Sequence, residues 1–306
     1  MSSTRIEGSF VATVTPFDRR GEIDFGAWQA LLDHQRQHGT RAILFMGSTG
    51  EPSLLLPEEK KRIVVETVKM RAAGMAFFYG CTGPSTEQVI ENVRFAAANG
   101  ADGAIIAAPP YICASEADIE QFYLEVADAV DLPLGIYNNP PRVKTDLHWE
   151  QLLRLFRHPN IVIHKESTAR VGQMAQILAA APDVSVMCCD SPNLGLVVPT
   201  MALGGHGTAN MGGNIAPAEM AAISTPWTGA KEAETFRKQY LALLPLLHFN
   251  YSAINPVAIK SLMRACGLPV GGFRKPLREL GDSELEAGLR IIRNIGLAEK
   301  YRYSLG

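Results

Sequence analysis

Eight short apolar runs separated by longer amphipathic stretches are the feature that most constrains the fold of this 306-residue chain. The apolar runs are Val11–Val14, Ala42–Phe45, Ala76–Tyr79, Gly103–Ala107, Leu134–Tyr137, Ile161–Lys165, Val184–Cys188 and Gly207–Ala209. They are apolar throughout, which is typical of parallel strands buried on both faces. Between them, residues such as Ile119, Phe122 and Val126 recur at helical spacing. The pattern predicts an α/β fold, a closed (β/α)8 TIM barrel, with an open doubly wound sheet as the alternative.

The last third of the chain lacks further strand signals. Helical patterns cover Ala230–Leu247, Pro256–Cys266 and Ser283–Ala298, which Gly- and Pro-containing segments separate. We therefore predict two parts: a catalytic (β/α)8 barrel over residues 1–225 and a C-terminal helical domain over residues 226–306.

Composition narrows the functional classes. The formal net charge is −2 with scattered basic residues, so neither a nucleic acid nor a membrane is expected as a partner. The N-terminal residues contain no signal-peptide core, and no apolar run is long enough to span a membrane. Five cysteines without a Cys-x-x-Cys pair fit a reducing cytoplasm, and seven scattered histidines predict no metal site.

Three polar segments lie where apolar runs end. Lys165 and Tyr137 each close a run, and Ser48 and Thr49 belong to the Gly47–Glu51 turn after another. The C-terminal strand ends of such a barrel meet at one mouth, where its chemistry takes place. Each residue also has an ordinary explanation, because a strand-end lysine can be solvated, a tyrosine can pack in the core, and turn hydroxyls can cap a helix.

Together these residues could form an imine with a keto acid. A nucleophilic lysine must be deprotonated, and we expect burial to lower the pKa of Lys165. Tyr137 could carry protons. The backbone amides of the Gly47–Glu51 turn could hold a carboxylate. Arg142, in a loop after Tyr137, could hold a second carboxylate by a two-pronged contact, although a loop arginine is most often a surface residue.

In the order and spacing of its motifs, nearly the whole chain resembles the dihydrodipicolinate synthase / N-acetylneuraminate lyase family of class I pyruvate-dependent aldolases. The motifs are Val14-Thr-Pro-Phe17, Gly47–Glu51, Pro109-Pro-Tyr111, Tyr137–Arg142, His164-Lys-Glu166, Gly204–Gly207 and Asn255-Pro256. The resemblance implies a homo-oligomer, a tetramer or a dimer, that needs no cofactor. It implies that Lys165 is the Schiff-base lysine, Tyr137 the proton donor and acceptor, and Ser48 a member of the proton relay. Substrate would contact Thr49, Arg142, the backbone of Ala209, and Tyr111.

Within this family the motifs point in different directions. The pair Ser48-Thr49 resembles the lyase branch, whereas Arg142 matches the carboxylate-binding arginine of the synthase. Ile112 stands where the synthase has a second tyrosine that completes a proton relay. We expect a lyase that joins pyruvate or a pyruvate-derived 2-keto acid to an aldehyde, or separates them. The alternatives are 4-hydroxy-tetrahydrodipicolinate synthase of lysine biosynthesis, a keto-deoxy sugar acid aldolase or dehydratase, and a non-catalytic small-molecule-binding barrel.

Overall fold

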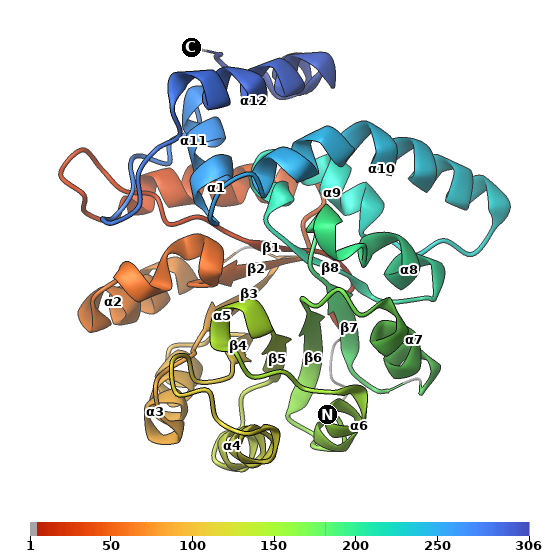
Figure 1. The fold of residues 1–306 in the computed structure, drawn as a ribbon. Coiled ribbons are helices and arrows are strands. Elements are labelled where there is room, and N and C mark those ends of the chain that lie inside the picture. The colour runs from red at the N-terminus through yellow and green to blue at the C-terminus, as the bar shows by residue number, and fades with distance from the viewer. Residues whose placement is uncertain (1–4, 72, 181, 306) are drawn as a thin grey trace.

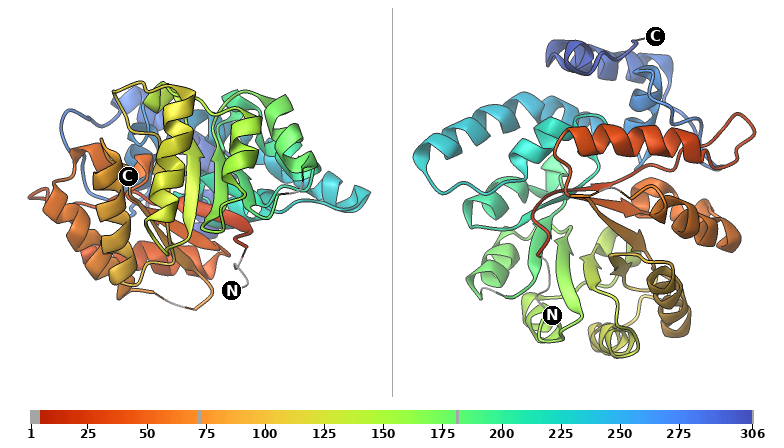
Figure 2. Two further views of the ribbon diagram at one scale, coloured as in Figure 1. Left: turned by 90° about the horizontal axis from the view of Figure 1, so that it is seen from below. Right: turned by 180° about the vertical axis from the view of Figure 1, so that it is seen from behind.

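Eight parallel strands close into one barrel in chain order, with helices around the outside (Figures 1 and 2). The computed structural model describes residues 5–305 except 72 and 181. The strands are β1 (Gly8–Ala12), β2 (Ala42–Phe45), β3 (Ala76–Gly80), β4 (Gly103–Ala107), β5 (Leu134–Asn138), β6 (Ile161–Glu166), β7 (Ser185–Cys188) and β8 (Gly207–Asn210). The predicted TIM barrel is therefore confirmed, and the open sheet is excluded because β1 pairs with β8.

The first strand begins earlier than predicted. It covers Gly8–Ala12 instead of Val11–Val14, because its register with β8 starts at Gly8 opposite Gly207. The two backbones approach closely at this point: a Cβ on Gly207 would lie 2.0 Å from the carbonyl oxygen of Gly8. Gly207 therefore serves packing between strands, because a side chain at this position would separate β1 from β8.

Helices cover the outside of the barrel. They are α1 (Phe25–Gln37), α2 (Pro57–Val68), α3 (Thr86–Ala98), α4 (Glu116–Asp128), α5 (Pro140–Val143), α6 (Trp149–Leu155), α7 (Val171–Ala179), α8 (Val197–Ala202) and α9 (Pro217–Ile223). Local sequence explains several starts. Asp24 caps α1 by accepting from the Ala27 amide, and Ser115 and Asp118 form a capping box at α4.

Alternation along the strands separates two apolar layers. Side chains that point inward fill the barrel, and those that point outward pack against the helices. The inward set is Phe10, Ala12, Ala42, Leu44, Phe78, Ile105, Ile163, Met187 and Ala209, with Tyr137 packed against it. Because the interior is filled, a small molecule can reach the strand ends only at the mouth of the barrel.

The C-terminal helices lie along one side of the barrel, beside α1 and α9 (Figure 1). They are α10 (Ala230–Asn250), α11 (Val257–Ala265), α12 (Asp282–Asn294) and α13 (Leu297–Tyr301). The single helix predicted over Ser283–Ala298 is wrong, because Gly296 adopts the left-handed conformation (φ +75°) and separates α12 from α13. The domain boundary at residue 225 stays a prediction. Among the described residues, no helix is both long and apolar enough to cross a membrane.

Candidate active site

Lys165 and Tyr137 lie side by side at the strand ends. The two residues face each other in the register of β5 and β6, and alternation turns both side chains toward the barrel axis. The Nζ atom of Lys165 is 4.4 Å from the centroid of the Tyr137 ring. Lys165 is only 6% exposed, so it is not a solvated surface lysine. The structure thus brings together the predicted amine and the predicted phenol.

The protonation of Lys165 differs from the sequence-based expectation. Burial lowers the pKa of this amine, but its interactions with Tyr137, Cys189 and Asp190 raise it by more. The net pKa of Lys165 lies above its ordinary value of 10.5, so the expected lowering is wrong for the free site. The amine is therefore mostly an ammonium at neutral pH, and it must lose a proton before it can attack a carbonyl carbon.

A buried polar group beside Lys165 explains part of this raised pKa. Asp190 is 1% exposed and accepts from the Tyr251 hydroxyl at 2.6 Å and from the Gly212 amide at 2.8 Å. The Cys189 thiol lies 3.1 Å from the same Tyr251 hydroxyl. Sequence analysis missed this group, because Tyr251 comes from the end of α10, 61 residues beyond Asp190. A carboxylate held in this way favours a positive charge on the neighbouring lysine.

The Gly47–Glu51 turn lies at the end of β2 as a short 3-10 helix over Ser48–Gly50. Thr49 is buried and Ser48 half-buried. The amide of Asn255, from the segment between α10 and α11, donates to Ser48 Oγ at 3.3 Å and to Thr49 Oγ1 at 3.2 Å. A C-terminal residue therefore orients both turn hydroxyls, a role that its place in a sequence motif did not indicate.

A buried ion pair anchors the end of this turn. Glu51, in the left-handed conformation (φ +58°), accepts from Lys260 Nζ of α11 at 2.6 Å. Both side chains are 0% exposed. Glu51 also accepts from the backbone amide of Arg274 at 3.0 Å, and Lys260 donates to the carbonyl of Thr15 at 2.8 Å. The C-terminal helices thus hold the turn that carries Ser48 and Thr49.

The hydroxyl of Tyr137 bonds to a residue that sequence analysis did not single out. The Asn139 side-chain amide donates to this oxygen at 2.7 Å. Ser48, the predicted relay partner, instead takes its hydrogen bond from Asn255. The relay through Ser48 therefore stays a prediction, and Asn139 donates a hydrogen bond to the phenol in this structure.

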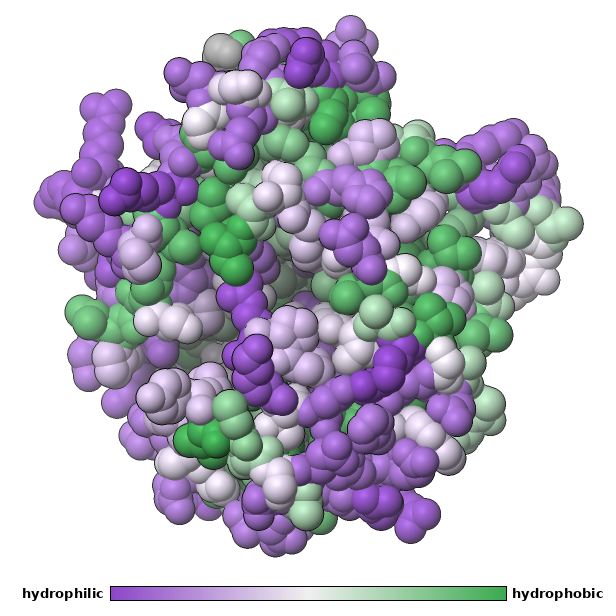
Figure 3. Space-filling model, in the orientation of Figure 1, coloured by the Kyte–Doolittle hydropathy of each residue, from purple (hydrophilic) through white to green (hydrophobic). Residues whose placement is uncertain are grey.

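A cavity of about 660 Å³ opens beside Tyr137. Ser48, Tyr137, Asn139, Arg142 and Asn255 form one part of its wall, and residues of α2 and α3 form another. Figure 3 shows this face of the molecule, with a hollow near its centre. The Arg142 side chain is exposed at the opening and donates to the Asn255 carbonyl at 3.4 Å. The guanidinium is thus free to bind an anion that enters the cavity.

Two further predicted substrate contacts, Ala209 and Tyr111, do not line this cavity. Ala209 is 3% exposed on β8 and belongs to the barrel interior. Tyr111 is 96% exposed in the β4–α4 loop, where its φ is +78°, and the neighbouring Ile112 is also exposed. Within a single chain, Tyr111 is therefore not brought together with Lys165 and Tyr137.

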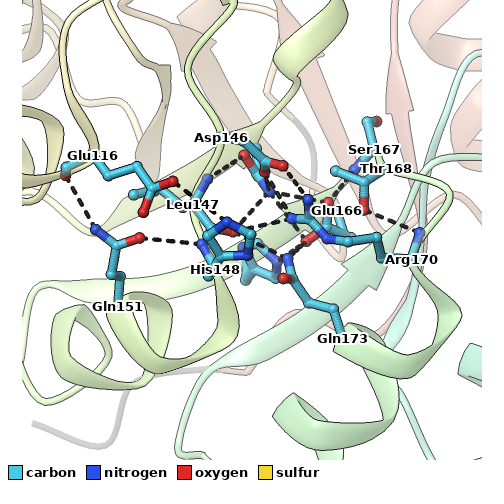
Figure 4. A network of polar contacts seen from close by, with 12 residues as sticks. Glu116, Asp146, Leu147, His148, Gln151, Glu166, Ser167, Thr168, Arg170 and Gln173 are labelled. Carbon is cyan, nitrogen blue, oxygen red and sulfur yellow. Dashed lines mark hydrogen bonds and ion pairs between the residues drawn. The ribbon is translucent and has the colours of Figure 1, made fainter.

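A buried polar network supports the outer side of β6 (Figure 4). Glu166, which follows Lys165, is 0% exposed and lies next to His164 Nε2 (3.2 Å), Gln173 Nε2 (2.9 Å) and Asn138 Nδ2 (3.2 Å). Burial raises the pKa of Glu166, but these neighbours lower it by more, so the group stays a carboxylate. Because Glu166 points away from the mouth, the network fixes the strand end that presents Lys165 and takes no direct part in chemistry.

Comparison with known proteins agrees with this geometry. The sequence profile of the Dihydrodipicolinate synthetase family matches residues 5–295. The chain belongs to this family. Its members include the 4-hydroxy-tetrahydrodipicolinate synthase of Leptothrix cholodnii, 34% identical over 95% of this chain and 99% of the relative. The corresponding enzyme of Exiguobacterium sibiricum is 31% identical over 94% and 99% of the two chains.

Solved structures of the dihydrodipicolinate synthetase family share the whole architecture. The dihydrodipicolinate synthase of Acinetobacter baumannii, described as complexed with pyruvate, superposes with a TM-score of 0.88 at 29% identity, covering 95% of this chain and 99% of that one. The 4-hydroxy-tetrahydrodipicolinate synthase of Methylacidiphilum fumariolicum gives a TM-score of 0.89 at 26% identity, covering 98% and 100%. The protein is accordingly a lyase of the class I aldolase type.

Proposed function

We propose that this protein forms a Schiff base between Lys165 and pyruvate, or a pyruvate-derived 2-keto acid, and uses it to join or release an aldehyde. The observation that carries the proposal is the buried Lys165 beside the ring of Tyr137, with a separation of 4.4 Å between Nζ and the ring centroid. The nearby cavity of about 660 Å³ offers room for both reactants.

The proposed reaction begins when the neutral amine of Lys165 attacks the keto carbon. The resulting carbinolamine loses water, and the carbon–nitrogen double bond of a protonated imine forms. Loss of a proton from the neighbouring methyl carbon then gives an enamine. The electrons of the broken C–H bond form a carbon–carbon double bond, and those of the C=N double bond move to the nitrogen. The enamine carbon attacks the aldehyde carbon, and the aldehyde oxygen takes a proton. Hydrolysis of the imine finally frees the product and restores Lys165.

The contacts of the turn suggest how the keto acid would be oriented. The hydroxyls of Ser48 and Thr49 and the surrounding backbone amides lie at the end of β2, and Asn255 holds both hydroxyls. Such a turn can receive the carboxylate while Lys165 holds the keto carbon. Arg142, which lines the same cavity, would then meet a charged group of the aldehyde.

Relatives favour one aldehyde partner. Many curated relatives at 30–34% identity are named 4-hydroxy-tetrahydrodipicolinate synthase, and Arg142 supports an acidic acceptor. Formation of that product from pyruvate requires an aldehyde with an amine and a carboxylate, such as aspartate semialdehyde. Synthesis of 4-hydroxy-tetrahydrodipicolinate is therefore the first activity to test.

A second acceptor class has its own support. Ile112 replaces the second tyrosine expected of the synthase, and Ser48 replaces a threonine of the turn. These two changes favour cleavage or dehydration of a keto-deoxy sugar acid, an acid whose hydroxyls could bond to Asn139 and Asn255 on the cavity wall. The intact Lys165–Tyr137 pair argues against the non-catalytic barrel that the sequence left open.

An NMR assay separates these activities. In parallel samples, the protein is incubated with pyruvate plus aspartate semialdehyde, with pyruvate plus sugar-derived aldehydes, or with keto-deoxy sugar acids alone. Loss of pyruvate with aspartate semialdehyde supports the synthase, whereas release of pyruvate from a sugar acid supports the aldolase. Turnover of none of them, together with reversible binding of pyruvate, would favour the binding barrel.

Self-association is part of the proposal. Several apolar side chains on α7, α8 and α10 and in the β4–α4 loop are exposed, namely Val171, Val198, Leu203, Leu241, Tyr111 and Ile112. Burial of such side chains between copies would remove apolar surface from water. We expect a homo-oligomer, a tetramer or a dimer, and light scattering would measure its mass; a monomer at assay concentration would contradict this part. The cytoplasmic location stays a prediction.

A further inference from the structure

The phenol of Tyr137 has a neighbour that belongs to this chain's own loop. Asn139 follows two residues later, and its side-chain amide lies 2.7 Å from the phenol oxygen. Asn139 is 7% exposed and lines the cavity with Tyr137. Both side chains of this hydrogen bond therefore face the space where a substrate would lie.

The backbone holds Asn139 in place. The backbone carbonyl of Asn139 accepts from the backbone amides of Arg142 at 2.9 Å and Val143 at 3.3 Å, which are the first N–H groups of α5. Pro140 follows at the first helical position and restricts the chain further. The side-chain amide of Asn139 therefore contacts the phenol from a fixed backbone, and the substrate does not have to order this segment first.

The type of donor decides what the phenol can do. A side-chain NH₂ group has hydrogens and no acceptor, so the oxygen of Tyr137 accepts this bond. The hydrogen of the phenol is then free to point at another atom in the cavity. A donor aimed at the oxygen also stabilises the phenolate that remains after the proton has left.

Ser48 makes its hydrogen bond with another residue in this structure. Its oxygen accepts from Asn255 Nδ2 at 3.3 Å, and the same amide bonds Thr49 at 3.2 Å. In the described part of the chain no hydrogen bond joins Ser48 to Tyr137, whereas Asn139 already makes its contact with the phenol. The hydrogen bond to the phenol in this structure thus comes from the Asn139 amide, whereas the sequence predicted a hydroxyl.

We propose that Asn139 is a positioning residue for proton transfer by Tyr137, an inference that rests on the proposed function. The phenol gives its proton to the carbinolamine hydroxyl, which leaves as water while the C=N bond forms. The phenolate, stabilised by the Asn139 amide, then removes a proton from the methyl carbon beside the imine. This second transfer restores the phenol and yields the neutral enamine, so protons and electrons balance without another reactant.

Exchange of the methyl hydrogens of pyruvate in D₂O tests this step without any aldehyde. Proton NMR follows the exchange with the parent protein, Asn139→Leu, Asn139→Asp, Tyr137→Phe and the Asn139→Leu/Tyr137→Phe double variant. Leucine removes the amide donor, whereas aspartate keeps the shape but offers a negative oxygen. Borohydride reduction with pyruvate, read by intact mass, measures in each variant whether Lys165 still forms the imine.

We expect Asn139→Leu to slow exchange by about 10- to 100-fold, the range for a lost hydrogen bond to a charged group. Trapping of pyruvate after long incubation should persist, because Lys165 is unchanged. In Asn139→Asp the pH profile of exchange should move to higher pH, since a neighbouring carboxylate raises the pKa of the phenol. In the Tyr137→Phe background, Asn139→Leu should change the rate by less than about twofold.

Three results would overturn the proposal, and they can be told apart. Exchange by Asn139→Leu and Asn139→Asp at the parental rate, with pyruvate still trapped, would mean that Asn139 only fills space, and the proposed function would stand. A parent protein that traps no pyruvate would remove the proposed function and this inference with it. If Asn139→Leu slows exchange as much in the Tyr137→Phe background as in the parent protein, Asn139 acts independently of the phenol. That result also contradicts the proposal.

Discussion

Replacement of Lys260 by methionine should strongly destabilise the protein, because it would leave Glu51 buried without its charged partner. The two groups are 2.6 Å apart and 0% exposed. At that separation their attraction is roughly 6 kcal/mol for an effective dielectric constant of about 20. Much of this is offset by the cost of burying both charges, and loss of one partner of a buried pair typically costs about 3–5 kcal/mol. We expect a loss of that size in the free energy of unfolding of Lys260→Met.

A surface pair of similar length provides the control. Lys238 lies 2.8 Å from Glu234 on α10, with both side chains more than half exposed. Lys238→Met should cost about 0.5 kcal/mol or less, because exposed pairs contribute little. Urea unfolding followed by tryptophan fluorescence measures both variants. A loss below about 1 kcal/mol for Lys260→Met would refute the argument that this ion pair holds the Gly47–Glu51 turn.

The same pair predicts a pH dependence. Burial lowers the pKa of Lys260, Glu51 opposes this, and the result is a pKa of about 8 against an ordinary value of 10.5. Between these two values the unfolded chain binds more protons than the folded one. The contribution of Lys260 to the free energy of unfolding should therefore rise with pH in this window, by at most about 1.4 kcal/mol per pH unit. Lys260→Met should lack that rise, which unfolding at several pH values above about 8 would show.

Three other substitutions test single parts of the site. Tyr137→Phe keeps the ring and should slow turnover by about 10²–10⁴-fold, so a steady-state rate near the parental value would make Tyr137 structural. Arg142→Lys should weaken use of an acidic aldehyde far more than pyruvate trapping; equal losses in both assays would assign Arg142 to the loop. Gly80→Ala would place a Cβ 2.2 Å from the Met46 carbonyl oxygen, and thermal unfolding should register a loss of about 1–3 kcal/mol. A parental melting temperature would show that the turn after Met46 adapts.

The barrel could be predicted because its signal is local and repeated. Most strands are short apolar runs buried on both faces, and Ala42–Phe45 and Gly103–Ala107 have the predicted bounds. The bounds of less regular elements were harder to predict. β1 contains the polar Ser9, which hid its start, and the left-handed Gly296 divided a pattern that otherwise continues as one helix.

The site could be predicted only where a residue marks the end of a strand. Lys165 and Tyr137 were found in this way, and their contact confirms that the two strand ends meet. Partners from distant segments left no local signal: Asn255 lies 206 residues from Thr49. The direction of the Lys165 pKa was not predicted either, because it depends on Tyr137, Cys189 and Asp190 together, and only the folded chain places these groups around the amine.

Reductive trapping of pyruvate tests the central claim most directly. The protein is incubated with pyruvate, reduced with borohydride, weighed intact, and digested to locate the modified lysine. The account predicts a mass gain of one reduced pyruvate per chain, located on Lys165, and no gain in a folded Lys165→Ala variant. An unchanged mass in the parent protein, or an adduct on another lysine such as Lys60 or Lys260, would contradict it.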